Sequence, residues 1–189
     1  MQLTKKLGVI ALLILLQGCS AAIVAGTAGA VTSASDRRTL GTQIDDNNIE
    51  IKATLALKSD EKLAKFSNVI VVSLNGNVLL IGQTPTTEMR AKAAKLVEPV
   101  LGVKRIHNQI RIGNITGIST KTHDTWLTSK VKTQLIAEET LSANDIKVVT
   151  ENGEVFLMGI VTETEANKAT EIARHVSGVE KVIKVFEYL

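Results

Sequence analysis

The side chains that could carry catalytic or metal chemistry are few in this 189-residue chain and lie far apart in the sequence. No group of His, Cys, Asp and Glu residues has the short spacing that metal ligands need. No glycine-rich phosphate loop is present, and the acidic pairs adjoin no apolar pocket that would raise a carboxyl pKa. These patterns predict a non-enzymatic protein without metal or cofactor. The residues considered are His107, His123, His175, Glu138, Glu139, Glu163 and Glu165.

Cys19 is the one residue whose position indicates a covalent modification. Two lysines precede an apolar run, residues 7–16, which is too short to span a bilayer and is typical of a secretory signal. The following residues, Leu16-Gln17-Gly18-Cys19, resemble the lipobox of bacterial lipoproteins, whose cysteine is acylated and becomes the mature N-terminus. Several acyl chains on Cys19 would form an effectively permanent anchor. An ordinary signal peptide cut near Ala21 remains the alternative.

Composition excludes other classes of protein. Cleavage after residue 18 removes two lysines, so the formal charge of +3 falls by two, and the pI of about 9.0 is no sign of nucleic-acid binding. The lone cysteine excludes an intramolecular disulfide, so core packing must stabilise the fold. Residues 19–45 are rich in Ala, Gly, Ser and Thr and predict an acylated flexible tether. The alternative is an alanine-rich helix on the bilayer, over residues 21–31.

The rest of the chain contains an internal duplication. Residues 75–82, NGNVLLIG, recur at residues 152–159 as NGEVFLMG. Residues 102–106, GVKRI, recur at residues 178–182 as GVEKV, in the same order and with nearly the same spacing. The sequence therefore predicts two copies of one structural unit.

Each copy shows the same succession of elements. An opening helix, for which Asp46 and Asp124 are candidate N-caps, precedes a β-run, an Asn-Gly hairpin turn and a second β-run. A second helix, over about residues 87–101 and 163–176, ends before a glycine, and a last strand follows. In copy one this strand alternates apolar and polar residues from Ile106 to Ile112. The opening helices place apolar residues at i, i+4 and i+8: Ile49, Ala53 and Leu57, then Leu127, Val131 and Leu135.

These elements predict an α+β fold of two tandem αββαβ units, each a three-stranded mixed sheet packed by two helices. Units of this size are marginally stable alone, so we expect the two copies to pack against each other. The expected boundaries are 1–18 for the signal peptide, 19–45 for the tether, 46–115 and 124–189 for the units, and 116–123 for the linker.

The duplicated pattern resembles the BON domain, and two such units behind a lipobox resemble the dual-BON outer-membrane lipoproteins of bacteria. The resemblance extends over nearly the whole chain. It implies a periplasm-facing, lipid-anchored protein of the outer membrane that binds anionic phospholipid through its second BON unit. It also implies a role in outer-membrane integrity and accumulation at the division site. Ser20 directly after the cysteine fits sorting to the outer membrane.

The opening helix of copy two carries the residues that would contact lipid. Wound at about 100° per residue, it places Trp126 and Ile136 about 140° from the core direction, one on each side. Lys130 and Lys132 lie about 100° from the core direction, one on each side, and Thr133 points nearly opposite to the core. An exposed tryptophan, an exposed isoleucine and flanking lysines are typical of a helix at a membrane interface. The predicted lipid-binding set is Trp126, Lys130, Lys132, Thr133, Ile136 and Ala137.

Copy one lacks this surface, since Asn48 and Lys58 stand where copy two has Trp126 and Ile136. We interpret Ile51 and Leu55, which lie off its apolar stripe, as a patch that contacts copy two or the tether.

Three other interpretations stay open. Trp126 could instead pack on the linker near Ile115 and Ile118. The same helix could dock an envelope protein partner, which would make the protein an adaptor. A cell-wall-binding protein is the third alternative.

Overall fold

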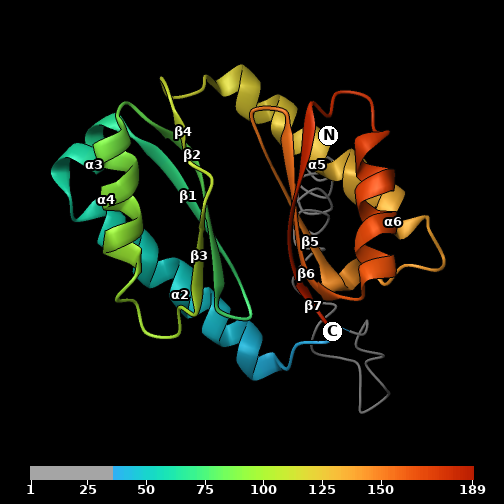
Figure 1. Ribbon diagram of the computed structural model, residues 1–189. Coiled ribbons are helices and arrows are strands. Elements are labelled where there is room, and N and C mark those ends of the chain that lie inside the picture. The colour runs from blue at the N-terminus through green and yellow to red at the C-terminus, as the bar shows by residue number, and fades with distance from the viewer. Residues whose placement is uncertain (1–35) are drawn as a thin grey trace, which may run out of the picture. The chain divides into compact units, whose positions relative to one another are not determined.

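A computed structural model describes residues 36–189 as two αββαβ repeats in succession (Figure 1). The signal segment, Cys19 and the tether as far as residue 35 lie outside the described residues. Repeat 1 consists of α2 (Leu40–Lys58), α3 (Glu61–Phe66), β1 (Asn68–Leu74), β2 (Asn77–Thr84), α4 (Thr87–Val97), β3 (Arg105–Asn108) and β4 (Arg111–Ile112). Repeat 2 consists of α5 (Ile118–Ile136), the 3-10 turn η2 (Ala143–Asp145), β5 (Ile146–Glu151), β6 (Glu154–Val161), α6 (Glu163–Arg174) and β7 (Lys181–Tyr188). The predicted fold class is confirmed.

Each sheet is mixed, with the second hairpin strand in the centre. In repeat 1, β2 is antiparallel to β1 and parallel to β3, and in repeat 2, β6 is antiparallel to β5 and parallel to β7. The last strand of repeat 1 departs from the predicted continuous alternation, because it is interrupted between β3 and β4. Ile110 lies in that interruption and is buried, whereas Ile112 after it is 45% exposed.

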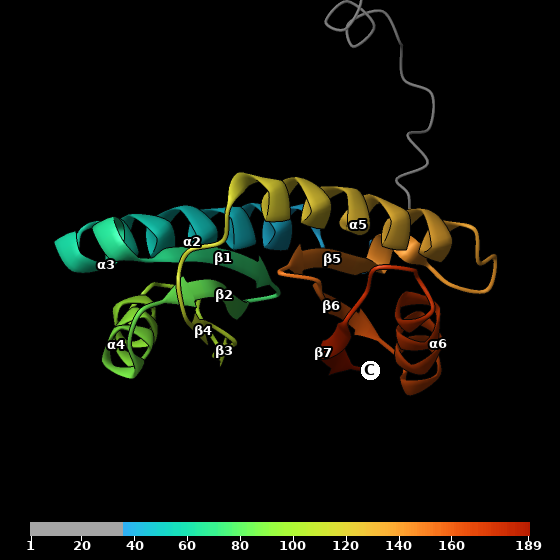
Figure 2. The same ribbon diagram turned by 90° about the horizontal axis from the view of Figure 1, so that it is seen from above.

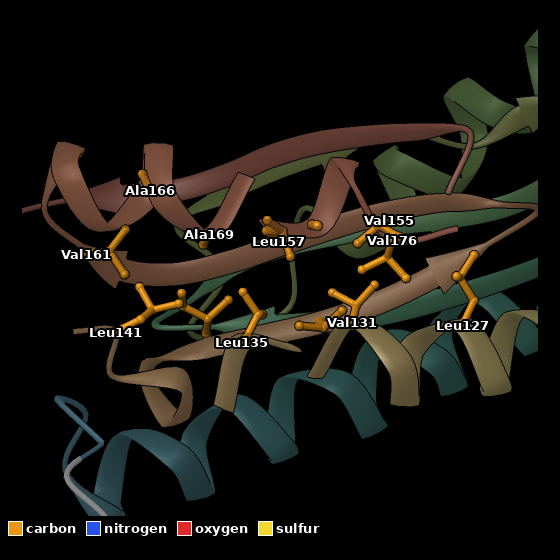
Figure 3. Packing of buried hydrophobic residues seen from close by; sticks show 13 residues of the cluster. Leu127, Val131, Leu135, Leu141, Val155, Leu157, Val161, Ala166, Ala169 and Val176 are labelled. Atoms are coloured by element: carbon orange, nitrogen blue, oxygen red, sulfur yellow. The ribbon is translucent and has the colours of Figure 1, made fainter. Parts of the chain in front are cut away.

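Apolar side chains fill three layers. One cluster lies between the helices and the sheet of each repeat, and Figure 3 shows that of repeat 2, where Leu127, Val131 and Leu135 of α5 face Val155 and Leu157 of β6. The third cluster joins the outer faces of the two sheets and includes Leu79, Ile81, Phe156 and Met158. A strand that is buried on both faces reads as a continuous apolar run, which explains VLLI in β2 and VFLM in β6.

Polar contacts reinforce the junction between the repeats. Gln83 donates to Glu151 at 2.5 Å, and Arg111 forms an ion pair with Glu154. The expectation that the copies pack against each other is confirmed, and the described residues belong to one compact unit.

The opening helices begin earlier than the sequence suggested. Thr39 caps α2 and Gly117 precedes α5, so residues 40–45, expected in the tether, and 118–123, expected in the linker, are helical. The first turns of both helices place large apolar side chains in solvent, for example Leu40 at 78% and Ile118 at 85% exposed. An apolar stripe marks only the part of a helix that covers the sheet, so the stripe in the sequence did not indicate these first turns. The second helices end at Val97 and Arg174, a few residues earlier than predicted.

Asp46 and Asp124 are not N-caps; each lies inside its helix and binds the hairpin turn of its own repeat. The Asp46 carboxylate accepts hydrogen bonds from the backbone N–H groups of Asn75 and Gly76, at 2.8 and 2.9 Å. Asp124 accepts the corresponding pair from Asn152 and Gly153, at the same two distances. The positive φ of both turn residues, 53° and 76° in repeat 1, turns the two N–H groups toward one acceptor. The repeated aspartate thus fastens each opening helix to its Asn-Gly turn.

Candidate membrane-binding face of α5

Helix α5 lies over the sheet of repeat 2 (Figure 2). One apolar stripe of this helix is buried against the sheet. Leu127, Val131 and Leu135 are at most 1% exposed, as the helical pattern predicted. On the outward side, Trp126 is 52% exposed and Ile136 is 69% exposed. Two large apolar side chains therefore face solvent from the helix that also forms the core of this repeat.

Lysine and histidine side chains border the indole ring of Trp126. The ammonium group of Lys130 lies 4.3 Å from the ring centroid, a cation–π distance, and also donates to the carbonyl of Ser177 at 3.1 Å. The ring of His123 lies 5.7 Å from the indole, tilted by 38°. These neighbours hold the indole at the surface beside a positive charge.

The remaining residues of the predicted set are all exposed on α5. Lys132 borders two grooves on the side of the helix away from Lys130, and Ala137 is the C-cap. The hydroxyl of Thr133 donates to the carbonyl of Ser129, four residues earlier, at 2.9 Å. Thr122, Thr125 and Ser129 make the same bond within the helix. Because these hydroxyls bind their own helix, the outward face presents less polarity than its composition suggests.

The outward face of α5 carries no carboxylate. Asp124 is the only acidic residue of α5, and it is 4% exposed and bound to the hairpin turn. The same helix contains three lysines, which are Lys121, Lys130 and Lys132. By contrast, α2 contains three acidic residues and two lysines. The duplicated helices therefore differ in the sign of their charge.

The interpretation of Ile51 and Leu55 as a patch that contacts copy two is wrong, and its alternative, a contact with the tether, stays a prediction. Their side chains are 58% and 62% exposed, so neither is buried against repeat 2. Leu40 and Ile44, at 78% and 62% exposed, extend the same side of α2 at positions i and i+4. Sequence reasoning missed this longer apolar stripe because it begins in residues 40–45, whose composition is typical of a tether.

Arg37 attaches the start of the described chain to repeat 2. Its guanidinium donates to both carboxylate oxygens of Glu165, at 2.9 and 2.7 Å, and to the carbonyl of Ile160 at 2.9 Å. Its backbone N–H donates to Asp145 at 2.9 Å. The side-chain hydrogen bond from Arg37 lowers the pKa of Glu165 to about 2. Arg37 thus holds the first described residues on the repeat that carries α5, a contact that composition alone did not indicate.

Comparison with known proteins assigns the repeats. The BON domain family matches residues 45–114 and residues 123–189. The chain belongs to the BON-domain family. These two segments are called BON domain 1 and BON domain 2 below.

Relatives of known name are similar to this chain over most of its length. The chain is 44% identical over 93% of its length to "Outer membrane lipoprotein DolP" of Haemophilus influenzae, of which it covers 91%. It is 42% identical over 82% of its length to "21 kDa hemolysin" of Actinobacillus pleuropneumoniae, of which it covers 79%. It is 28% identical over 78% of its length to "Osmotically-inducible protein Y" of Escherichia coli, of which it covers 75%. None of these names is that of an enzyme.

These likenesses place this dual-BON protein in the outer membrane as a lipid-anchored lipoprotein. Within residues 36–189, no helix is long and apolar enough to cross a membrane. The same residues contain no group of His, Asp and Glu side chains arranged to hold a metal ion.

Proposed function

We propose that the outward face of α5 in BON domain 2 binds anionic phospholipid while acyl chains on Cys19 anchor the protein. The protein would thereby support outer-membrane integrity. The observation that carries the proposal is the exposed indole of Trp126 beside the Lys130 ammonium, on a helix whose only carboxylate is buried. Accumulation at the division site is part of the proposal and rests on resemblance to the family.

The energetics favour a reversible contact for this face. Burying the exposed parts of Trp126 and Ile136 contributes at most about 2 to 3 kcal/mol each at roughly 25 cal/mol per Å². Each lysine near an anionic surface adds about 1 kcal/mol. The summed binding free energy of this face is small compared with that of several acyl chains, each of which contributes about 0.8 kcal/mol per buried methylene. The anchor would hold the protein on the membrane, and α5 would respond to the charge of the lipid.

Replacing Trp126 with glutamate is expected to weaken binding to phosphatidylglycerol vesicles by about tenfold or more, because it removes the apolar contact and adds a repelled charge. The measurement is vesicle co-sedimentation of residues 20–189 without acyl groups. This form retains all three apolar clusters. Far-UV circular dichroism reports whether the variant is folded.

Asn48→Glu is the matched control, because Asn48 is exposed on α2 at the position that Trp126 occupies on α5. It adds the same charge and should leave vesicle binding unchanged. Equal binding by folded Trp126→Glu and wild-type protein would contradict the proposal. Binding to isolated envelope proteins or peptidoglycan, without binding to vesicles, would favour an adaptor or a cell-wall protein instead.

A further inference from the structure

Strands β1 and β5 are equivalent edge strands of the two BON sheets. In each hairpin, one pair of residues flanks the two-residue Asn-Gly turn, and the next pair along the strands is Ser73 with Val78 in repeat 1 and Thr150 with Val155 in repeat 2. The flanking residues of such a turn exchange both backbone hydrogen bonds, so the next pair exchanges none. The N–H and C=O groups of Ser73 and Thr150 therefore point away from the hairpin, toward the free edge.

At Ser73, two charged side chains close the free edge of β1. Glu50 of α2 accepts a hydrogen bond from the backbone N–H of Ser73 at 2.8 Å. Lys147, from BON domain 2, donates to the Ser73 carbonyl at 3.3 Å and to Glu50 at 2.7 Å. We call this pair the Glu50–Lys147 latch.

The corresponding edge of β5 has no latch. In the duplication, Thr128 stands at the place of Glu50, and Ile70 at the place of Lys147. Thr128 donates its hydroxyl to the Thr150 side chain at 2.8 Å, and Ile70 offers only an apolar side chain, 36% exposed. No hydrogen bond found in residues 36–189 engages the outward backbone groups of Val148 or Thr150.

Val148 and Thr150 are themselves only 3% and 7% exposed, and a groove of about 480 Å³ between α5, β5 and Ile70 gives access to their edge. It touches Val148, Val149, Thr150 and Glu151 in succession. Because successive strand side chains point to opposite faces, a groove that touches four in a row lies along the backbone edge. Unpaired strand edges of this kind are where an extended chain adds to a sheet.

The exposed charge along the groove is positive, because its two lysines are exposed whereas its two carboxylates, Asp124 and Glu151, are 4% and 6% exposed. Lys121 and Lys132 line it from α5, eleven residues and about 16 Å apart on one side of the helix. Asp124, which also lines it, is bound to the hairpin turn, and Glu151 accepts from Gln83. The distance between the lysines equals about five residues of an extended strand.

We propose that the edge of β5 binds an extended acidic peptide segment of a partner protein as an added strand. Its backbone pairs with Val148 and Thr150, and its carboxylates meet Lys121 and Lys132. The chain's own residues 20–35 contain no Asp or Glu, so they would leave both lysines unpaired. An acyl chain would leave the strand's N–H and C=O groups without partners. This site shares Lys132 with the predicted lipid-binding set, but Trp126 does not line it.

The decisive variant transfers the latch of BON domain 1 to BON domain 2. Ile70→Lys with Thr128→Glu places the two latch residues at β5. The probe is an acetylated, amidated peptide of alternating threonine and valine with two glutamates four residues apart, so that both point to the same face of the added strand. We expect the wild-type protein to bind it and the double variant to bind about tenfold or more weakly by calorimetry. Peptide binding should also slow hydrogen exchange at the Val148 and Thr150 amides, whereas Ser73 should not change.

Two controls make the result specific. Asn48→Glu should leave peptide binding unchanged, and replacing the glutamates of the probe with lysines should abolish it. Phosphatidylglycerol vesicle binding by the double variant should match wild type, which separates this site from the outward face of α5. Equal peptide binding by the folded double variant would overturn the proposal. So would protection of Val148 and Thr150 by a peptide of residues 20–35 or by dodecanoate in place of the acidic peptide.

Discussion

Replacing Asp46 with alanine is expected to lower the free energy of unfolding by about 3 kcal/mol or more, because buried hydrogen-bond donors lose their acceptor. The carboxylate accepts from Ser73 at 2.7 Å, from the Asn75 and Gly76 amides, and from Arg38 at 3.1 Å. Each buried polar group left without a partner costs about 1 to 3 kcal/mol. Within residues 36–189, the Asp124 carboxylate binds only the two turn amides, so Asp124→Ala should cost less.

Urea unfolding of residues 20–189 would measure this difference. Asp45→Ala is the matched control, since it removes the same charge from the exposed neighbouring position on α2. An Asp46→Ala variant that unfolds within about 0.5 kcal/mol of Asp45→Ala would show that the turn contact contributes little.

The pH dependence gives a second readout of the same contact. Burial alone would raise the pKa of Asp46, but hydrogen bonds from Gly76, Ser73, Asn75 and Arg38 outweigh it and hold the pKa below its ordinary value. A carboxyl whose folded pKa is lowered contributes stability above its unfolded pKa, near 3.9, and loses it as the pH falls through the folded pKa. Asp46→Ala should therefore reduce the loss of stability on acidification.

Local patterns in the sequence were sufficient for the elements of the fold. The spacing of Leu127, Val131 and Leu135 marks the buried side of α5, and Asn-Gly marks each hairpin, because both signals depend on neighbours in the chain. The role of Asp46 could not be predicted in this way. Its acceptor function depends on a turn about thirty residues later, and an aspartate near an expected helix start is more simply interpreted as an N-cap.

In the candidate site, too, features that depend on neighbours in the chain could be predicted, whereas contacts between distant residues could not. The helical pattern predicted that Trp126 and Ile136 face outward, which depends only on α5 itself. It could not predict that Arg37 binds Glu165, because that contact joins residues 128 positions apart. The open edge of β5 emerges only when the two repeats are compared in space. Thr128 and Ile70 are unremarkable in the sequence until Glu50 and Lys147 are seen to close the other edge.

The acyl anchor on Cys19 should dominate membrane attachment in the cell. Mass spectrometry of the mature protein is expected to show acyl groups on an N-terminal Cys19. Export of residues 20–189 behind an ordinary cleavable signal peptide should transfer most of the protein from the outer membrane to the soluble periplasmic fraction. A mature N-terminus near Ala21, without acyl groups, would contradict this assignment.

Combining this change with Trp126→Glu separates the anchor from α5. With the anchor present, Trp126→Glu should leave the protein in the membrane fraction, because acyl burial far exceeds the few kcal/mol that the α5 face contributes. Without the anchor, the same substitution should remove the remaining membrane-bound protein. Arg37 holds the tether on BON domain 2, so the anchor raises the effective concentration of α5 at the bilayer. Even a weak α5 contact would then be occupied at the membrane, and it could still be released when the lipid surface loses its negative charge.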